Sequence, residues 1–192
     1  DNGTHLKVSS TLNGKAVQGG KATPKQSGIR VPLIASWPGK IKPGRTTSDL
    51  VDASDFFPTL ADLAQVKIPK QRQIDGISFA PTLYDQPGKK REWCFFWYDP
   101  RPGWDKNRFS RSIFALDHNY KLFSDGRLFD IRGEEMKESE IGKNLSSKKA
   151  QLAKSKLEQA IRKSMEGLLS KHALKEVDAY GNLLNEKDFR PK

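Results

Sequence analysis

The sequence is poor in cysteine and has no long apolar run. Its single cysteine, Cys94, excludes an intrachain disulfide and a metal site made of several cysteines. Because Cys94 lies within an aromatic stretch, we expect a buried and inert thiol. No apolar segment is long enough to cross a bilayer, and no segment has the pattern of a signal peptide. With 35% hydrophobic and 30% charged residues, the 192-residue chain is typical of a globular protein with a modest core.

Acidic residues are the minority among the charged ones. The chain has 34 lysines and arginines against 23 acidic residues, which gives a formal net charge of +11. Such a charge can attract a polyanion or an anionic substrate. Many of the lysines fall in the C-terminal third, where a helical pattern predicts a solvated surface. We therefore do not predict a nucleic-acid partner.

The chain opens on Asp1-Asn2-Gly3, which places a carboxylate beside an amide oxygen. A hard cation such as Ca²⁺ is bound by these two kinds of oxygen. The same tripeptide is also typical of a tight turn, because Asn and Gly tolerate positive φ and Asp can bond its own backbone. On these residues alone, a turn and part of a cation site are both open.

Three more motifs follow in the first third of the chain. Gly19-Gly20-Lys21 is followed by a Gly-Ile-Arg-Val-Pro-Leu-Ile run within residues 28–41 and by an Asp-Phe-Phe-Pro-Thr-Leu run within 52–60. In this order, and after Asp1-Asn2-Gly3, they resemble the second half of a type I sulfatase, an arylsulfatase-like branch of the alkaline-phosphatase superfamily. The resemblance fades in the last helix and tail; before that it continues through residues 75–78 and, more loosely, through 128–131 to 144–145.

The resemblance implies an α/β fold with two regions. Residues 1–88 would be the closing part of the sulfatase catalytic α/β domain, of the alkaline-phosphatase-like type. Residues 89–192 would be a C-terminal subdomain, a small antiparallel sheet packed against a long helix, with an irregular tail. A Pro-Gly and lysine-rich segment at 86–91 is typical of a linker and agrees with a boundary near residue 89.

The residue pattern predicts the elements of the first region. Asn13-Gly14 suits the type I′ turn of a short hairpin. The apolar run over residues 29–37 predicts a strand buried on both faces. From Asp52 the pattern becomes helical, with Ser54 or Asp55 as a cap. We expect the buried face of this helix to consist of Leu60, Leu63 and Ala64.

Short apolar runs separated by turn residues predict antiparallel hairpins in the second region. The expected strands cover residues 92–98, 111–117, 120–124 and 128–131. A helix over residues 147–172 is expected to cover one face of this sheet. Its apolar stripe consists of Leu152, Ala153, Leu157, Ala160, Ile161, Met165 and Leu168.

The resemblance also implies roles for individual residues. Asp1 and Asn2 would be two ligands of a Ca²⁺ whose site is completed by N-terminal acidic residues outside this chain, and such a cation neutralises and orients a sulfate. Lys21 would contact the sulfate and assist the leaving oxygen; a surface lysine in a flexible loop is the alternative. His5 is a further catalytic candidate, as a substrate contact or proton donor, and an exposed loop histidine is the competing interpretation.

A second candidate substrate contact is the arginine-rich loop that includes Trp104. It combines this tryptophan with Arg101 and Arg108. Aromatic and guanidinium groups together can stack on sugars and hold anions. Because this region often borders the substrate cleft in the family, the resemblance implies that these side chains bind substrate. A loop anchored by one tryptophan is the alternative.

The chain departs from the family pattern at two places. It has Gln26-Ser27-Gly28 where the family often has Glu-Gly-Gly, so no acidic side chain is available at that position. Sulfatases also use a formylglycine made within a Cys/Ser-X-Pro-X-Arg motif, and this sequence contains none. Cys94 is followed by aromatic residues and cannot replace it. We therefore expect this chain alone to be inactive.

The sequence thus predicts the C-terminal fragment of a sulfatase that hydrolyses sulfate esters of sulfated carbohydrate. Its partners would be a sulfated small molecule or polysaccharide and the missing N-terminal part of the same protein. The resemblance implies a periplasmic or secreted location. One alternative is a phosphodiesterase or phosphonate hydrolase on the same scaffold, because phosphate and sulfate esters are similar tetrahedral anions. Another is a non-catalytic module that binds sulfated polysaccharide through its basic face.

Overall fold

The computed structural model describes residues 3–98, 112–133, 136–142 and 145–171, with side chains described up to residue 166 in the last helix. Contacts within the chain divide it into two compact units, one of Asp1–Val31 with Phe95–Lys192 and one of Pro32–Cys94. The predicted domain boundary near residue 89 stays a prediction. Among the helices in the described ranges, none is both long enough and apolar enough to cross a membrane.

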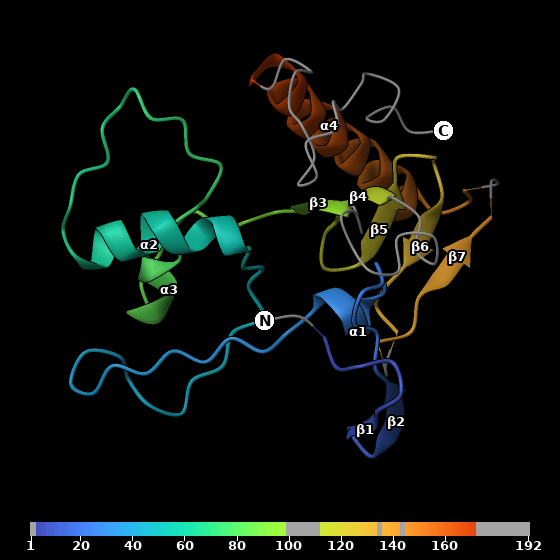
Figure 1. The fold of residues 1–192 in the computed structure, drawn as a ribbon, viewed down its shortest axis with the longest axis horizontal. Coiled ribbons are helices and arrows are strands. Elements are labelled where there is room, and N and C mark those ends of the chain that lie inside the picture. The colour runs from blue at the N-terminus through green and yellow to red at the C-terminus, as the bar shows by residue number, and fades with distance from the viewer. Residues whose placement is uncertain (1–2, 99–111, 134–135, 143–144, 172–192) are drawn as a thin grey trace, which may run out of the picture. The chain divides into compact units, whose positions relative to one another are not determined.

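The first unit is built on a five-stranded sheet whose strand order follows the chain order, β3-β4-β5-β6-β7 (Figure 1). Consecutive strands from β4 to β7 pair antiparallel. The predicted antiparallel sheet is confirmed, and β7 is an additional strand. The bounds are β3 Cys94–Tyr98, β4 Ser112–Leu116, β5 Tyr120–Phe123, β6 Leu128–Asp130 and β7 Ser139–Ile141.

Aspartate side chains close the tight turns of this sheet. In the β4–β5 turn, Asp117 Oδ1 accepts hydrogen bonds from the backbone N–H groups of Asn119 and Tyr120, each at 2.9 Å. In the β5–β6 turn, Asp125 Oδ1 accepts from the N–H of Arg127, and Gly126 has φ +90°, a conformation that glycine adopts without a side-chain clash. These turns bring consecutive apolar runs into antiparallel pairing.

One helix, α4 (Lys148–Lys171), packs against β4 and β5, as predicted (Figure 1). Its buried residues repeat every three or four positions, which is the spacing of one helix face. Leu152 departs from the predicted stripe because it is 72% exposed, one position before the buried Ala153. Leu168 lies outside the described side chains. The buried residues are Ala150, Ala153, Leu157 and Ala160.

The N-terminal part of the first unit consists of a hairpin and a short helix. Strands β1 (Ser9–Leu12) and β2 (Lys15–Gln18) pair antiparallel. Asn13 and Gly14 between them have φ of 51° and 79°, so the predicted primed turn is confirmed. Helix α1 (Gln26–Ile29) follows.

The second unit is organised around a buried aspartate. A 3-10 turn, η1 (Ala53–Asp55), leads into α2 (Phe56–Leu63), and α2 packs against α3 (Ala80–Leu83). Asp52 and Asp55 form a reciprocal capping box at the start of η1. Asp55 Oδ1 also accepts from the N–H of Ile77 at 2.6 Å, and Asp55 Oδ2 accepts from Arg91 Nε at 2.8 Å.

Two predictions for the first region, residues 1–88, are wrong in this structure. Residues 30–37 are not a strand, and Leu33 and Ile34 are 46% and 88% exposed. A strand needs a ladder partner, and no described residue supplies one here. On α2 the residues that become buried are Pro58 and Thr59, whereas Leu60, expected on the buried face, is 61% exposed. In both places the described residues do not cover the apolar side chains.

Candidate functional site

Three backbone segments that carry the N-terminal motifs meet in the first unit. The N–H of Gly3 donates to the carbonyl of Gly28 at 3.0 Å, and the N–H of Lys21 donates to the carbonyl of Thr4 at 2.9 Å. The N–H of Thr23 donates to the carbonyl of Gly20 at 3.0 Å. The segment that directly follows Asp1-Asn2 therefore lies against the Gly-Gly-Lys loop, although about twenty residues separate them in sequence.

Glycine is required where these segments approach each other most closely. A Cβ on Gly20 would lie 2.3 Å from Ser27 Oγ and 2.7 Å from the backbone nitrogen of Gly28. A Cβ on Gly28 would lie 2.2 Å from the carbonyl oxygen of Gly20. No side chain can enter at these distances without displacing the backbone. The glycines of the motif thus allow direct backbone contact beside Lys21.

Lys21 and His5 are brought into the same region, and both side chains are exposed. His5 Nδ1 accepts a hydrogen bond from the N–H of Lys7 at 3.1 Å, which leaves Nε2 as the ring nitrogen that can face a ligand. An exposed ammonium and an imidazole on one loop cluster can bind a tetrahedral anion and exchange a proton with it. Their catalytic roles stay predictions.

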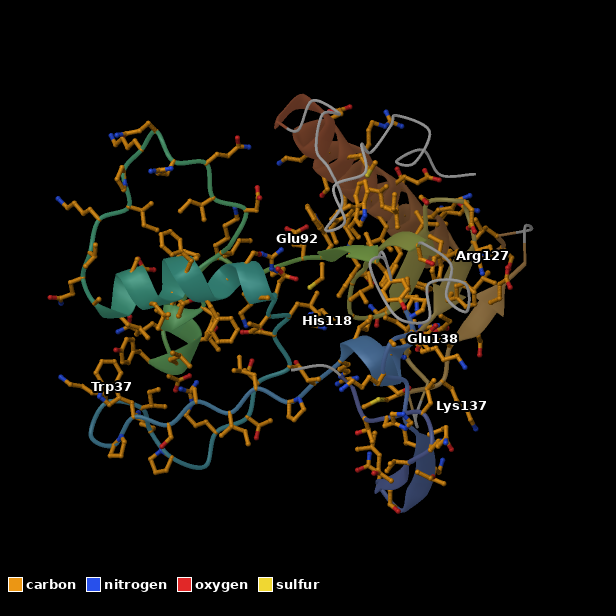
Figure 2. All side chains as sticks on the ribbon, in the orientation of Figure 1. Trp37, Glu92, His118, Arg127, Lys137 and Glu138 are labelled. Carbon is orange, nitrogen blue, oxygen red and sulfur yellow. The ribbon has the colours of Figure 1, made fainter. Side chains whose placement is uncertain are left out.

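The loop that follows Lys21 is held by side chains from the sheet. Tyr98 Oη donates to the carbonyl of Ala22 at 2.7 Å. Lys121 Nζ donates to the carbonyl of Pro24 at 2.7 Å, and Glu138 Oε1 accepts from the N–H of Gln26 at 2.7 Å. Figure 2 shows Glu138 beside α1, which begins at this glutamine. Three separate parts of the C-terminal region thus contact one short loop.

Lys121 and Glu138 form a buried ion pair beneath this loop. Lys121 Nζ lies 2.8 and 2.7 Å from the two carboxylate oxygens of Glu138. The Lys121 side chain is 1% exposed, and its ammonium lies 5.2 Å from the ring centre of Phe114 and 5.0 Å from that of Phe123. Burial lowers the pKa of the Lys121 ammonium, while the hydrogen bond and the charge of Glu138 oppose that shift.

The Gln26 side chain is buried and connects the loop to the C-terminal region by hydrogen bonds. It is 5% exposed, and its side-chain Nε2 donates to the carbonyls of Ile131 at 3.2 Å and Lys137 at 3.4 Å. A carboxylate has no proton to donate to these carbonyls, so the amide at this position suits the local hydrogen bonding. The departure of this chain from an acidic residue at Gln26 therefore has a physical reason.

Several predicted site residues lie outside the described ranges. These are the metal candidates Asp1 and Asn2 and the substrate-binding candidates Arg101, Trp104 and Arg108. Within the described residues, no group of three or more His, Cys, Asp and Glu side chains is placed to hold a metal ion. The residues that sequence reasoning missed are Lys121, Glu138 and Tyr98. One usable signal was Lys121 itself, a charged residue inside an apolar strand, which requires a buried partner.

Comparison with known proteins shows the class to which the chain belongs. Residues 21–167 match the family described as N-sulphoglucosamine sulphohydrolase, C-terminal. This match covers more than half of the chain, and the chain belongs to that family of sulfatase C-terminal regions. The predicted resemblance and fold class are confirmed.

The individual relatives are also sulfatases. The chain is 36% identical over 114 residues to the uncharacterized sulfatase YdeN of Escherichia coli, covering 55% of this chain and 20% of that protein. It is 44% identical over 66 residues to the steryl-sulfatase of Rattus norvegicus, covering 34% and 11%. It is 44% identical over 64 residues to an ulvan-active sulfatase of Formosa agariphila, covering 33% and 12%. The chain therefore spans a fifth or less of the length of these relatives, and sulfate-ester hydrolysis is the activity of the family.

Proposed function

We propose that this chain is the C-terminal portion of a sulfatase and that it contributes Lys21, Asp1 and Asn2 to a site that hydrolyses sulfate esters. The observation that carries the proposal is the hydrogen bond from the N–H of Lys21 to the carbonyl of Thr4. It joins the Gly-Gly-Lys loop to the segment three residues beyond Asp1. The loop that carries the candidate anion contact is therefore hydrogen bonded to the segment that follows the candidate metal ligands in sequence.

Lys21 would bind the sulfate group of the substrate. Its exposed ammonium is a compact positive charge that can contact more than one sulfate oxygen and stabilise negative charge on the leaving oxygen. His5, on the neighbouring segment, would donate a proton to that oxygen or contact the substrate. The close backbone packing at Gly20 and Gly28 restricts how far the loop can move.

A Ca²⁺ fits the donor types of the first two residues of the sequence. Asp1 and Asn2 supply a carboxylate and an amide oxygen, the ligands that calcium prefers. The backbone of the next residue, Gly3, is fixed by its hydrogen bond to Gly28. When bound, the cation would supply Lewis-acid polarisation of the sulfate. Further acidic ligands and the formylglycine nucleophile would come from the N-terminal part of the protein, so this chain alone would be inactive.

Sulfated carbohydrate is the substrate class that we propose. The family description names a sulphated amino sugar, and one relative is named for its action on ulvan. Another relative is named a steryl-sulfatase, so the names of relatives alone do not decide the substrate. The net charge of +11 favours approach of a polyanion. We assign the sugar contacts to Trp104, Arg101 and Arg108, in the arginine-rich part of the sequence.

The test uses the parent protein with its N-terminal part. Sulfate release from 4-nitrophenyl sulfate and from sulfated oligosaccharides should require added Ca²⁺ after chelation, and Lys21→Ala should lower kcat/KM by about 100-fold, the order seen when one donor to a developing charge is removed. Lys25→Ala, in the same loop, is the matched control and should retain activity. Loss of the same size in both variants would contradict the assignment of Lys21.

The same assay separates the two alternatives. Faster release of 4-nitrophenol from bis(4-nitrophenyl) phosphate, which leaves 4-nitrophenyl phosphate as the other product, than from 4-nitrophenyl sulfate would identify a phosphodiesterase of this superfamily. Salt-sensitive binding of heparin or carrageenan that persists in Lys21→Ala and Asp1→Ala, without any sulfate release, would identify a non-catalytic binding module.

A further inference from the structure

The side chains that contact the loop after Lys21 come from two strands of the C-terminal sheet and from the residue before its last strand. Tyr98 is the last residue of β3, Lys121 lies in β5, and Glu138 directly precedes β7. They bind the loop at three positions in succession, the carbonyls of Ala22 and Pro24 and the N–H of Gln26. These three positions follow Lys21 within five residues.

We propose that Lys121 and Glu138 are positioning residues that act through the loop on Lys21 and so set the binding of the sulfate group. The proposal rests on the proposed role of Lys21 at the sulfate. In this proposal, the C-terminal sheet holds the anion-binding loop in place.

The geometry distinguishes this pair from an ordinary surface ion pair. The Lys121 side chain is 1% exposed and that of Glu138 is 14% exposed. Lys121 Nζ has three protein acceptors, two on Glu138 and one on Pro24, which uses all three of its protons. Glu138 Oε1 accepts both from Lys121 and from the backbone of Gln26. One loop carbonyl and one loop N–H are thus part of the same buried network.

The aromatic surroundings of Lys121 make it costly in free energy to break this network. The rings of Phe114 and Phe123 lie near the ammonium and exclude water from it. If the loop moved away, the carbonyl of Pro24 could not be replaced by solvent without opening this apolar layer. The cost of an unsatisfied buried charge therefore opposes displacement of the loop.

The first test measures the loop itself in the parent protein. Hydrogen exchange of the peptide that covers residues 19–31 should become faster in Lys121→Met than in the wild type, because the amides of Lys21, Thr23 and Gly28 are hydrogen bonded within the held loop. Exchange in the peptide that covers α2 should not change. If Lys121→Met folds poorly, Tyr98→Phe removes only the phenolic O–H on Ala22 and should give a smaller change of the same kind. Unchanged exchange of the loop in both variants would overturn the proposal.

The second test measures substrate binding by the same variants. Lys121→Met should raise KM and weaken competitive inhibition by inorganic sulfate, with a fall in kcat/KM of about 10- to 100-fold, as for other residues that orient a contacting group. Glu138→Gln keeps an oxygen acceptor and should have a smaller effect. Leu157→Ala is the control, because Leu157 is buried on the inner face of α4 and is not among the loop contacts. It should leave KM and sulfate inhibition unchanged per folded molecule.

A double-mutant cycle decides whether the effect passes through Lys21. In a Lys21→Ala background, the additional Lys121→Met change should cause no further fall in kcat/KM. A full further fall would overturn the proposal, because Lys121 would then act by another route. If the wild-type parent releases no sulfate, the proposed function fails, and inhibition is replaced by calorimetric binding of inorganic sulfate. Faster loop exchange together with weaker sulfate binding in Lys121→Met would then still sustain the positioning role.

Discussion

Asp55 links three segments of the second unit, because its carboxylate accepts hydrogen bonds from Asp52, Ile77 and Arg91. Burial alone would raise the pKa of its carboxyl group. The hydrogen bonds from Arg91 and from the backbone N–H groups of Ile77 and Asp52 more than offset burial and hold this pKa below its ordinary value of 3.8. The ionised form is therefore favoured by folding. Stability from this group is present above pH 3.8 and is lost as the pH falls through the lower folded-state pKa.

Replacement of Asp55 by Asn should show that the stability from this carboxylate depends on pH. Asp55→Asn leaves Arg91 without its carboxylate, and we expect the free energy of unfolding near neutral pH to fall by about 3 kcal/mol, as when one partner of a buried ion pair is removed. Urea unfolding followed at about pH 7 and again at about pH 2.5 measures the difference, which should shrink at the acid pH. Asp62→Asn, on the exposed side of α2, is the control. An equal difference at both pH values would contradict the ionised Asp55.

Cys94 should not react in the folded protein. Burial raises the pKa of the Cys94 thiol to about 12, so the reactive thiolate is scarce near neutral pH, and the residue is 4% exposed. A thiol reagent such as dithionitrobenzoate should label the chain only after urea is added. Rapid stoichiometric labelling without denaturant would show that the thiol is accessible. The burial predicted from the aromatic run is confirmed, and the inertness awaits this measurement.

At the scale of elements, α4 offers a matched pair of leucines. Leu157 is fully buried in the helix that packs on β4 and β5, whereas Leu152 is 72% exposed on the same helix. Leu157→Ala should lower the free energy of unfolding by about 3 kcal/mol, because it leaves a cavity in the core. Leu152→Ala should change it by less than about 0.5 kcal/mol. Chemical denaturation of the two variants measures both values, and similar losses would contradict the packing of α4.

The elements that could be predicted from sequence are those whose partners lie nearby in the chain. Strands β4, β5 and β6 follow one another across turns built on Asp117 and Asp125, so an apolar run and a turn signal were enough. β7 was missed because it has three residues, two of them exposed and polar in character. The strand expected over residues 29–37 is not present, because an apolar run forms a strand only where a partner pairs with it, and no described residue does so here.

In the candidate site too, only the features formed by neighbouring residues could be predicted from the sequence. The Gly-Gly-Lys motif was recognised from adjacent residues, but the side chains that hold it were not. Lys121 and Pro24 are 97 positions apart in sequence, and Lys121 and Glu138 are 17 apart. No helical or strand period links such positions. They meet only through the tertiary structure, in which the loop before α1 packs against the C-terminal sheet.

At the scale of the whole molecule, the second unit exposes many large apolar side chains. On α2, Phe57 and Leu60 are 62% and 61% exposed, and Ile34 is 88% exposed. Exposed apolar residues in this number are typical of a surface that another part of a protein covers. The relatives are at least five times as long as the matched part of this chain, so the function proposed above predicts that the rest of the catalytic domain covers this surface.

Cysteine labelling in the parent protein tests this prediction. Leu60→Cys should react slowly with a maleimide in the intact parent, because the catalytic domain would lie over α2 and exclude the reagent. Leu152→Cys, on the exposed side of α4, should react at the rate of a free thiol. Peptide mass mapping identifies the labelled position in each variant, and urea should bring both to the same rate. If Leu60→Cys reacts as quickly as Leu152→Cys before urea is added, the apolar side of α2 is open to solvent in the parent and its cover must be sought elsewhere.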